Sequence, residues 1–237
     1  MQAFVTPLRE LAEIENIHKK CRERQGLTQV TGCVTSQKTH MMYAIGDGFR
    51  CKIIDVSSEV KAKQIYEEYK CIGGNVYLYP AKDLLFYQAD LRGKYLIQKR
   101  MEVYQALLEQ PEVTVVATFD AYMDALLPLS ELENRIFSCK VGDVVDFEAV
   151  KQKMVALGYE REEQIEAAGQ FAVRGGILDV YPQNEEVPIR IELWGDEIDS
   201  IRTFDVQSQR SIENLQEIRI SPATDFPEEE THRVSFL

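Results

Sequence analysis

The chain has 237 residues with 45% hydrophobic and 28% charged side chains, which is enough for one large or two ordinary packed domains. Its formal net charge of −12 argues against a chain that grips a nucleic-acid backbone by itself. The five cysteines form no CxxC pair and no apolar run could span a bilayer, so we expect a cytoplasmic protein with reduced thiols and neither a zinc site nor a disulfide scaffold.

The first part of the chain is predicted to contain two helices separated by a short strand. Thr6 and Pro7 are typical of a helix cap and a first helical position, and apolar residues then recur at helical spacing until Gly26. A strand is predicted over residues 27–31, and a second helix ends at Gly46.

A degenerate phosphate loop is predicted between that strand and that helix. Gly32, Lys38 and Thr39 match the spacing of the pattern G-x-x-x-x-G-K-[ST], but Gln37 stands where the second glycine belongs. That glycine lets backbone N–H groups turn onto the phosphates, and a side chain there hinders the wrap. We therefore expect a relic loop without catalysis.

Nucleotide hydrolysis remains the alternative interpretation of this loop. It would need an aspartate at a later hydrophobic strand to hold Mg²⁺. Asp55 and Asp120 follow such strands, but nothing around them supports that role. We expect this chain to have no catalytic residue, metal or cofactor of its own.

Three apolar segments up to residue 127 alternate with helical segments. This order is typical of a parallel sheet covered by helices. The predicted strands are residues 50–56, 75–79 and 113–118, and the predicted helices are 58–72, 95–108 and 119–127. A short irregular insertion over about residues 80–93 carries exposed-looking aromatics at Phe86 and Tyr87. We assign residues 1–128 to this first, α/β domain.

The pattern changes at Pro128. A strand over Ile136–Val141 is followed by a helix capped at Asp146 and ended by Gly158, and then by consecutive strands up to Ile220. One helix with a run of antiparallel strands predicts an α+β domain over residues 129–222. Residues 223–237 are acidic and are interpreted as a linker or a truncated end.

The most informative strand of this second domain is Ile189–Trp194. Its aliphatic residues fall on one face, whereas Arg190, Glu192 and Trp194 fall on the other. Because the aliphatic face has to pack, we expect the other face to be exposed. Aromatic and arginine side chains on an open sheet face are typical of a binding hot spot.

The next strand is predicted to pair with this one as a hairpin. If residues 195–197 form the loop, Trp194 faces Ile198, Glu192 faces Ser200, and Arg190 faces Arg202; a two-residue loop would shift these pairs. Two facing arginines repel each other, and a carboxylate from a partner would relieve this. The alternative is a solvated face whose charges pair with each other.

The segments GQFAVRGGILDVYP and PIRIELWGDEIDSIRTFDVQSQRS resemble the domain shared by the UvrB family and the bacterial transcription-repair coupling factors (Mfd). The similarity is close over residues 141–222 and looser over residues 26–127. Members of the UvrB family carry an intact phosphate loop and a long tyrosine-rich hairpin, whereas this chain has a degenerate loop and a short insertion. The resemblance therefore favours the N-terminal, UvrB-like module of a coupling factor, which implies a degenerate P-loop parallel-sheet domain followed by an α+β antiparallel-sheet domain.

The resemblance also implies a function and its residues. Coupling factors recruit UvrA to stalled RNA polymerase in nucleotide excision repair, and their motor domains use ATP and Mg²⁺ to translocate on double-stranded DNA. Carried over by position, Arg174, Arg190 and Trp194 are expected to contact UvrA, with Glu192 and Arg202 as weaker candidates. The family usually has phenylalanine where Trp194 stands.

We accordingly expect a monomeric, non-catalytic module that docks onto UvrA and crosses no membrane. Replacing Arg190 or Trp194 by alanine is expected to abolish that docking while the fold persists. A nucleotide hydrolase or helicase acting through Lys38 and Thr39, and a UvrB-type binder of damaged DNA, are the alternatives.

Overall fold

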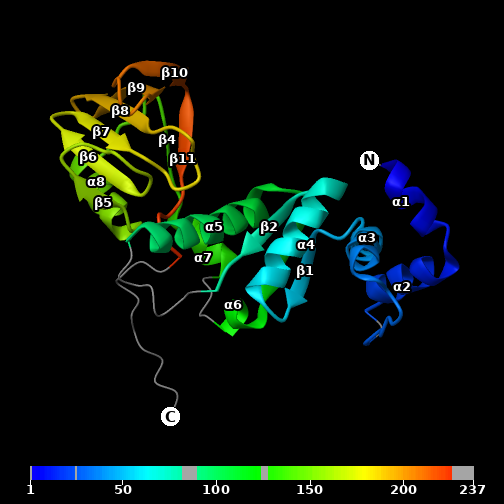
Figure 1. Ribbon diagram of the computed structural model, residues 1–237. Helices are drawn as coiled ribbons and strands as arrows, with labels where there is room; N and C mark the ends of the chain where they lie inside the picture. The colour runs from blue at the N-terminus through cyan, green and yellow to red at the C-terminus, as the bar shows by residue number, and fades with distance from the viewer. Residues whose placement is uncertain (1, 25, 82–89, 124–127, 226–237) are drawn as a thin grey trace, which may run out of the picture. The chain divides into compact units, whose positions relative to one another are not determined.

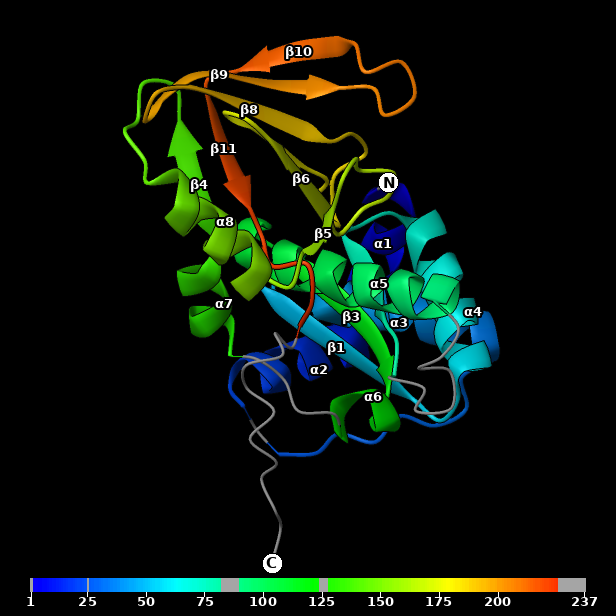
Figure 2. The same ribbon diagram turned by 90° about the vertical axis from the view of Figure 1, so that its left-hand side faces the viewer.

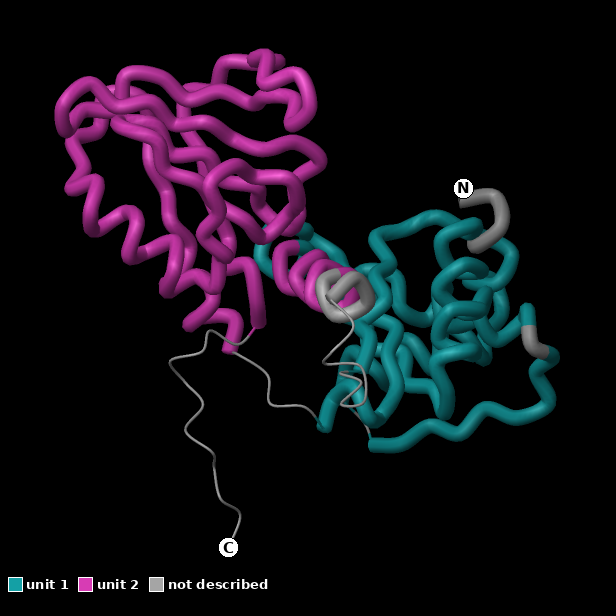
Figure 3. Tube along the Cα trace, turned by 60° about the vertical axis from the view of Figure 1, so that its left-hand side comes forward, with its two compact units in different colours: residues 1–84, 106–125 teal, residues 85–105, 126–237 magenta. Residues whose placement is uncertain are grey.

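The computed structural model describes residues 2–24, 26–81, 90–123 and 128–225 (Figure 1). The chain divides into two compact units, with residues 1–84 and 106–125 in unit 1 and residues 85–105 and 126–237 in unit 2 (Figure 3). Residues 85–105, which we had assigned to the first domain, thus belong to unit 2. Most of the predicted insertion, with Phe86 and Tyr87, and most of the predicted acidic end lie outside the described residues.

Unit 1 begins with three helices, α1 (Gln2–Arg9), α2 (Ala12–Arg22) and α3 (Thr35–Gly46). Buried Ile14 of α2 and Ala44 of α3 form their shared core. The prediction of a single helix that begins at Thr6 was wrong. The first helix begins at Gln2 and ends at Arg9, and a second helix, α2, begins at Ala12. Pro7 donates no backbone N–H, and Leu11 has an extended backbone that starts a new helix.

A parallel sheet completes unit 1 and confirms the predicted α/β pattern. Its strands β1 (Cys51–Val56), β2 (Val76–Tyr79) and β3 (Val113–Thr118) stand in the order β1-β3-β2. Helix α4 (Glu59–Ile72) covers one face. Ser58 caps its N-terminus, because the Ser58 hydroxyl accepts a hydrogen bond from the Lys61 N–H. Helix α6 (Phe119–Met123) follows β3. The strand predicted over residues 27–31 is absent, since that described segment pairs with no strand.

Unit 2 contains the predicted run of antiparallel strands (Figures 1 and 2). Six strands form a sheet in the order β10-β9-β8-β7-β6-β5, in which only the β5–β6 pair is parallel among the described strands. The strands are β5 (Glu160–Glu162), β6 (Gln170–Arg174), β7 (Ile177–Val180), β8 (Ile189–Trp194), β9 (Glu197–Phe204) and β10 (Ser211–Leu215). A separate antiparallel pair joins β4 (Phe137–Lys140) to β11 (Glu217–Ile220).

The inner face of this sheet carries the core of unit 2. Helix α8 (Phe147–Ala156) packs on it through Val150 and Met154, and β4 and β11 contribute further apolar side chains. As predicted, Asp146 caps α8, since its carboxylate accepts hydrogen bonds from the N–H groups of Glu148 and Ala149 at 3.0 and 3.2 Å. The sequence had not indicated α7 (Leu129–Arg135), which precedes β4.

Two further observations bear on the thiols and on membranes. The five cysteines are free, and burial raises the pKa of the Cys139 thiol to about 11, so this thiol stays protonated at neutral pH. Within the described part of the chain, no helix has the length and apolar composition to cross a membrane.

Helix α5 (Asp90–Glu109) is anchored in unit 2 by a buried ion pair. The Arg100 Nε donates to the Asp225 Oδ2 at 2.7 Å, and both side chains are almost completely buried. Further along α5, the Gln105 Oε1 accepts a hydrogen bond from the Asn184 side-chain amide at 2.6 Å. The stretch of α5 that belongs to unit 2 is therefore tied to the last described residue of the chain.

We predict that Arg100→Ala lowers the free energy of unfolding of unit 2 by about 3–5 kcal/mol, because it breaks the buried ion pair between Arg100 and Asp225. Urea denaturation followed by circular dichroism measures this loss. Lys99→Ala on the same helix is the control and should cost about 1 kcal/mol or less, since Lys99 pairs with Glu102 at the surface. Equal losses for the two variants would contradict the prediction.

Candidate partner-binding site

The outer face of the six-stranded sheet brings together all five residues predicted to contact a partner. Arg174 stands on β6, Arg190, Glu192 and Trp194 on β8, and Arg202 on β9. The inward-facing neighbours on these strands, such as Ile191 and Ile201, are buried in the core. The alternation in the sequence therefore assigned this face correctly.

A buried carboxylate that the sequence reasoning missed organises this face. Asp179 of β7 pairs directly with Arg190 of β8, and its side chain is only 2% exposed. The Arg190 Nε and Nη2 donate to its two oxygens at 2.6 and 2.8 Å, and the Arg174 Nη2 donates to the Oδ2 at 3.0 Å. Asp179 thus forms a bidentate ion pair with Arg190 and a single hydrogen bond with Arg174.

Arg190 is held on three sides and is mostly buried. Its side chain is 14% exposed, its guanidinium carbon lies 4.2 Å from the centre of the Phe204 ring, and its Nη2 donates to the Gln209 Oε1 at 2.8 Å. The hydrogen bonds with Asp179 raise the pKa of this guanidinium, so it stays charged. Phe204 itself belongs to a small core on this face with Ile165 and Ala172.

These contacts correct the expectation that a partner supplies the carboxylate between Arg190 and Arg202. The two arginines do face each other across β8 and β9, but the chain provides its own acids. Arg190 pairs with Asp179, and Arg202 forms an ion pair with Glu192, which also accepts a hydrogen bond from the Ser200 hydroxyl at 3.3 Å. Because Arg190 holds the buried Asp179, we now expect its replacement by alanine to lower the stability of the fold as well as to weaken docking.

The β8–β9 hairpin differs from the predicted register only at its tip. The pairs Arg190–Arg202 and Glu192–Ser200 are confirmed, whereas Trp194 pairs with Glu197 and not with Ile198. The loop has two residues, Gly195 and Asp196, and a bulge between Glu192 and Leu193, where β9 has one extra residue, restores the predicted pairs. Gly195 has a φ of 66°, which favours glycine at this tight turn.

Trp194 is the most prominent apolar group of this face. It is 85% exposed, although burial of its ring would contribute more to stability than burial of any other side-chain type. The turn of Gly175 and Gly176 lies against the same end of the sheet, because the Leu193 N–H donates to the Gly176 carbonyl at 2.8 Å. A Cβ on Gly176 would stand 3.0 Å from the Leu193 oxygen, so glycine permits this approach. Arg174, which precedes that turn, remains 48% exposed.

The predicted phosphate loop has a different environment from the one its spacing suggested. No strand of the described sheet precedes Gly32, and α3 begins at Thr35, before the lysine. The Gln37 side chain accepts a hydrogen bond from the Val34 N–H at 3.2 Å. Thr39 is buried and its hydroxyl donates to the Glu68 carboxylate at 2.6 Å, while Lys38 is exposed.

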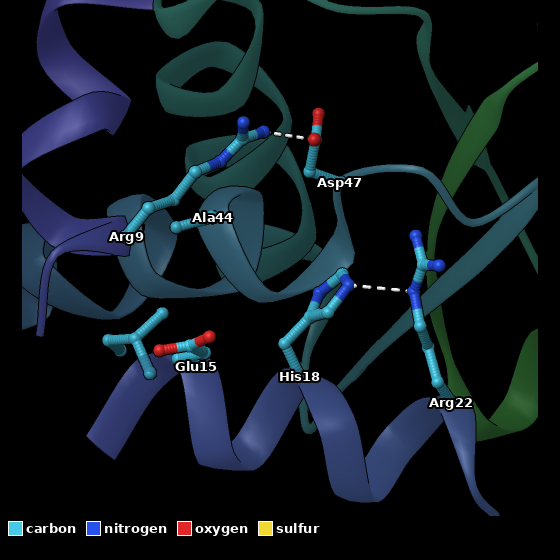
Figure 4. Close-up of a pocket in the computed structure, with 7 residues that line it drawn as sticks. Arg9, Glu15, His18, Arg22, Ala44 and Asp47 are labelled. Atoms are coloured by element: carbon cyan, nitrogen blue, oxygen red, sulfur yellow. Dashed lines mark hydrogen bonds and ion pairs between the residues drawn. The ribbon is translucent and has the colours of Figure 1, made fainter. Parts of the chain in front are cut away.

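A pocket of about 270 Å³ lies elsewhere in unit 1, between α2 and α3 (Figure 4). Several of the labelled side chains contact one another or the backbone. Arg9 reaches Asp47, the Arg22 Nε donates to the His18 Nε2 at 2.8 Å, and the His18 Nδ1 lies 2.9 Å from the Ile45 carbonyl oxygen. None of the four phosphate-loop residues lines this pocket.

A comparison with protein families finds a match that covers the six-stranded sheet of unit 2. Residues 137–226 match the UvrB interaction domain family, and this range contains every residue of the outer face described above. The chain is 34% identical over 151 residues to the transcription-repair-coupling factors of Staphylococcus aureus strain MRSA252 and Staphylococcus epidermidis strain ATCC 12228. Each alignment covers 64% of this chain and 13% of the relative, so the chain spans about an eighth of their length.

We predict that Arg190→Ala lowers the free energy of unfolding of unit 2 by about 3 kcal/mol, because Asp179 then keeps only Arg174 as a partner. Chemical denaturation measures the loss. Arg219→Ala, at an exposed arginine of β11, is the matched control and should change stability by less than about 0.5 kcal/mol. An Arg190→Ala chain as stable as the control would show that Asp179 does not depend on Arg190.

Proposed function

We propose, from the premise that residues 137–226 are a UvrB interaction domain, that this chain is the UvrA-docking module of a transcription-repair coupling factor. In this role it recruits UvrA to RNA polymerase stalled at a lesion. The observation that carries the proposal is the exposed Trp194, held beside a fixed row of charged side chains on one sheet face.

Trp194 has the properties of an anchor for a partner. Large aromatic side chains dominate the binding energy of protein interfaces when a partner buries them. The two-residue turn and the pairing with Glu197 fix the backbone of Trp194, so little further ordering of this backbone is needed on binding. An exposed tryptophan contributes little to the stability of the isolated unit. Its exposure therefore favours a role in binding.

The charged residues divide into a supporting and a presented group. Arg190 and Asp179 lie under the surface, whereas Arg174 is half exposed and the Glu192–Arg202 pair is partly exposed. Two arginines share the single Asp179 carboxylate, which leaves one positive charge (2 − 1 = +1) in a chain of net charge −12. We infer that this local positive charge at Arg174 meets a carboxylate of UvrA.

We propose that the chain contributes no nucleotide chemistry. A phosphate loop needs free backbone N–H groups between a strand and a helix, and a hydroxyl that can reach a metal ion. Here the Thr39 hydroxyl is engaged with Glu68 and no strand leads into Gly32. ATP, Mg²⁺, RNA polymerase and double-stranded DNA are proposed to engage the regions of a coupling factor outside the 13% that the alignments cover.

Titration of UvrA into the chain, followed by calorimetry, tests the docking role. We expect the unaltered chain to bind and Trp194→Ala to weaken binding roughly thirtyfold or more, because a central aromatic anchor contributes about 2 kcal/mol or more. Val155→Ala, at an exposed apolar residue of helix α8, is the control and should bind as the unaltered chain does. Unchanged binding by the Trp194 variant, with both variants folded, would sink the proposal.

A second titration, of ATP with Mg²⁺ into the same chain, tests the absence of nucleotide chemistry. We expect no heat of binding at concentrations up to about 1 mM, and therefore no difference between the unaltered chain and Lys38→Ala. Heat that is present in the unaltered chain and lost in the Lys38 variant would instead support a nucleotide site at the loop.

A further inference from the structure

We infer that the docking surface extends past Trp194 across β9 to Val144, and that Glu197, which lies between them, meets a basic side chain of the partner. This inference rests on the proposed docking to UvrA and adds two residues to it. The three side chains are called the edge row below.

The hydrogen bonds of the backbone place the edge row. Val144 forms an isolated antiparallel bridge with Glu197, in which the Val145 N–H donates to the Asp196 carbonyl at 2.8 Å and the Ile198 N–H donates to the Asp143 carbonyl at 2.9 Å. This is the pair type in which side chains come closest, and paired residues share a sheet face. Because Glu197 also pairs with Trp194, the order across the face is Trp194, Glu197, Val144.

The segment that carries Val144 is held firmly in place. The Gly142 N–H donates to the Ile198 carbonyl at 2.8 Å, and the Asp143 carboxylate accepts from the Lys140 N–H at 2.9 Å. The next residue, Val145, packs against the core of unit 2. Val144 thus points outward because its neighbour points inward, and its position is fixed before any partner arrives.

The edge row has the chemistry of a binding surface. Val144 is 76% exposed, so two apolar side chains flank one exposed carboxylate. Among the described residues the Glu197 carboxylate has no ion-pair or hydrogen-bond partner, in contrast to Asp179 and Glu192 on the same face. An apolar pocket rimmed by lysine or arginine would complement this arrangement.

Charge argues against other occupants of the edge row. In a symmetric dimer whose twofold axis passes through the edge row, Glu197 would lie beside Glu197 and Asp196 of the other copy. Nucleic acid would bring phosphates towards the same carboxylates in a chain of net charge −12. These charges favour a partner protein that has basic side chains around its binding pocket. The edge row is also continuous with the surface proposed to bind UvrA.

Calorimetric titration of UvrA into the full chain tests this inference with two variants and two matched controls. We expect Val144→Ser to weaken binding about tenfold, and Glu197→Lys to weaken it by a similar factor that shrinks as salt is raised. Val155→Ser on α8 and Glu213→Lys on β10 change the same residue types at other exposed positions and should stay within about twofold of the unaltered chain.

Thermal unfolding checks that each variant is folded. Val144→Thr serves as a second variant, because it keeps the branched shape of the side chain, and it should also weaken binding. Binding of Val144→Ser, Val144→Thr and Glu197→Lys within about twofold of the unaltered chain, while Trp194→Ala still weakens it, would overturn the edge row and leave the docking function standing. An unaltered chain that does not bind UvrA would overturn both.

Discussion

The structure of the candidate site depends on the buried carboxylate of Asp179. A charge removed from water has to be paired and hydrogen-bonded, and Asp179 meets this requirement through Arg190 and Arg174. These bonds join β6, β7 and β8 at one point. A slip of one residue between β7 and β8 would turn Asp179 or Arg190 into the apolar core, so the ion pair also specifies the register of the strands.

The same interaction separates residues that hold the site from residues that are free to bind. Family resemblance assigns Arg190 and Trp194 to one role, yet Arg190 lies beneath the surface and Trp194 lies on it. Loss of binding after a change at Arg190 would therefore mix a change in stability with a change in contact. Side chains that are exposed and uncommitted, such as Trp194, report on the partner alone, which is the physical reason for basing the docking test on them.

The sequence predicted which residues of β8 lie on the outer face, but it did not indicate that Asp179 organises them. Strict alternation in β8 identified Arg190, Glu192 and Trp194, and the hairpin register was correct beyond the tip, because the bulge between Glu192 and Leu193 offsets the shorter loop. Asp179 was missed because Leu178 and Val180 on either side are buried, so the segment resembles an ordinary apolar strand. A carboxylate in such a strand is itself a signal, since it has to find a cation across the sheet.

The strand predicted over residues 27–31 does not form. The reason also explains why the spacing of the phosphate-loop residues does not by itself indicate phosphate binding. A short apolar segment becomes a strand only when a neighbouring strand accepts its hydrogen bonds, and the described sheet of unit 1 consists of segments later in the chain. The spacing of Gly32, Lys38 and Thr39 does not contain that information. The helix starts at Thr35, and the Thr39 hydroxyl is bound to Glu68 of α4, so Thr39 serves the packing of α3 on α4. A motif thus predicts phosphate chemistry only when its strand is present.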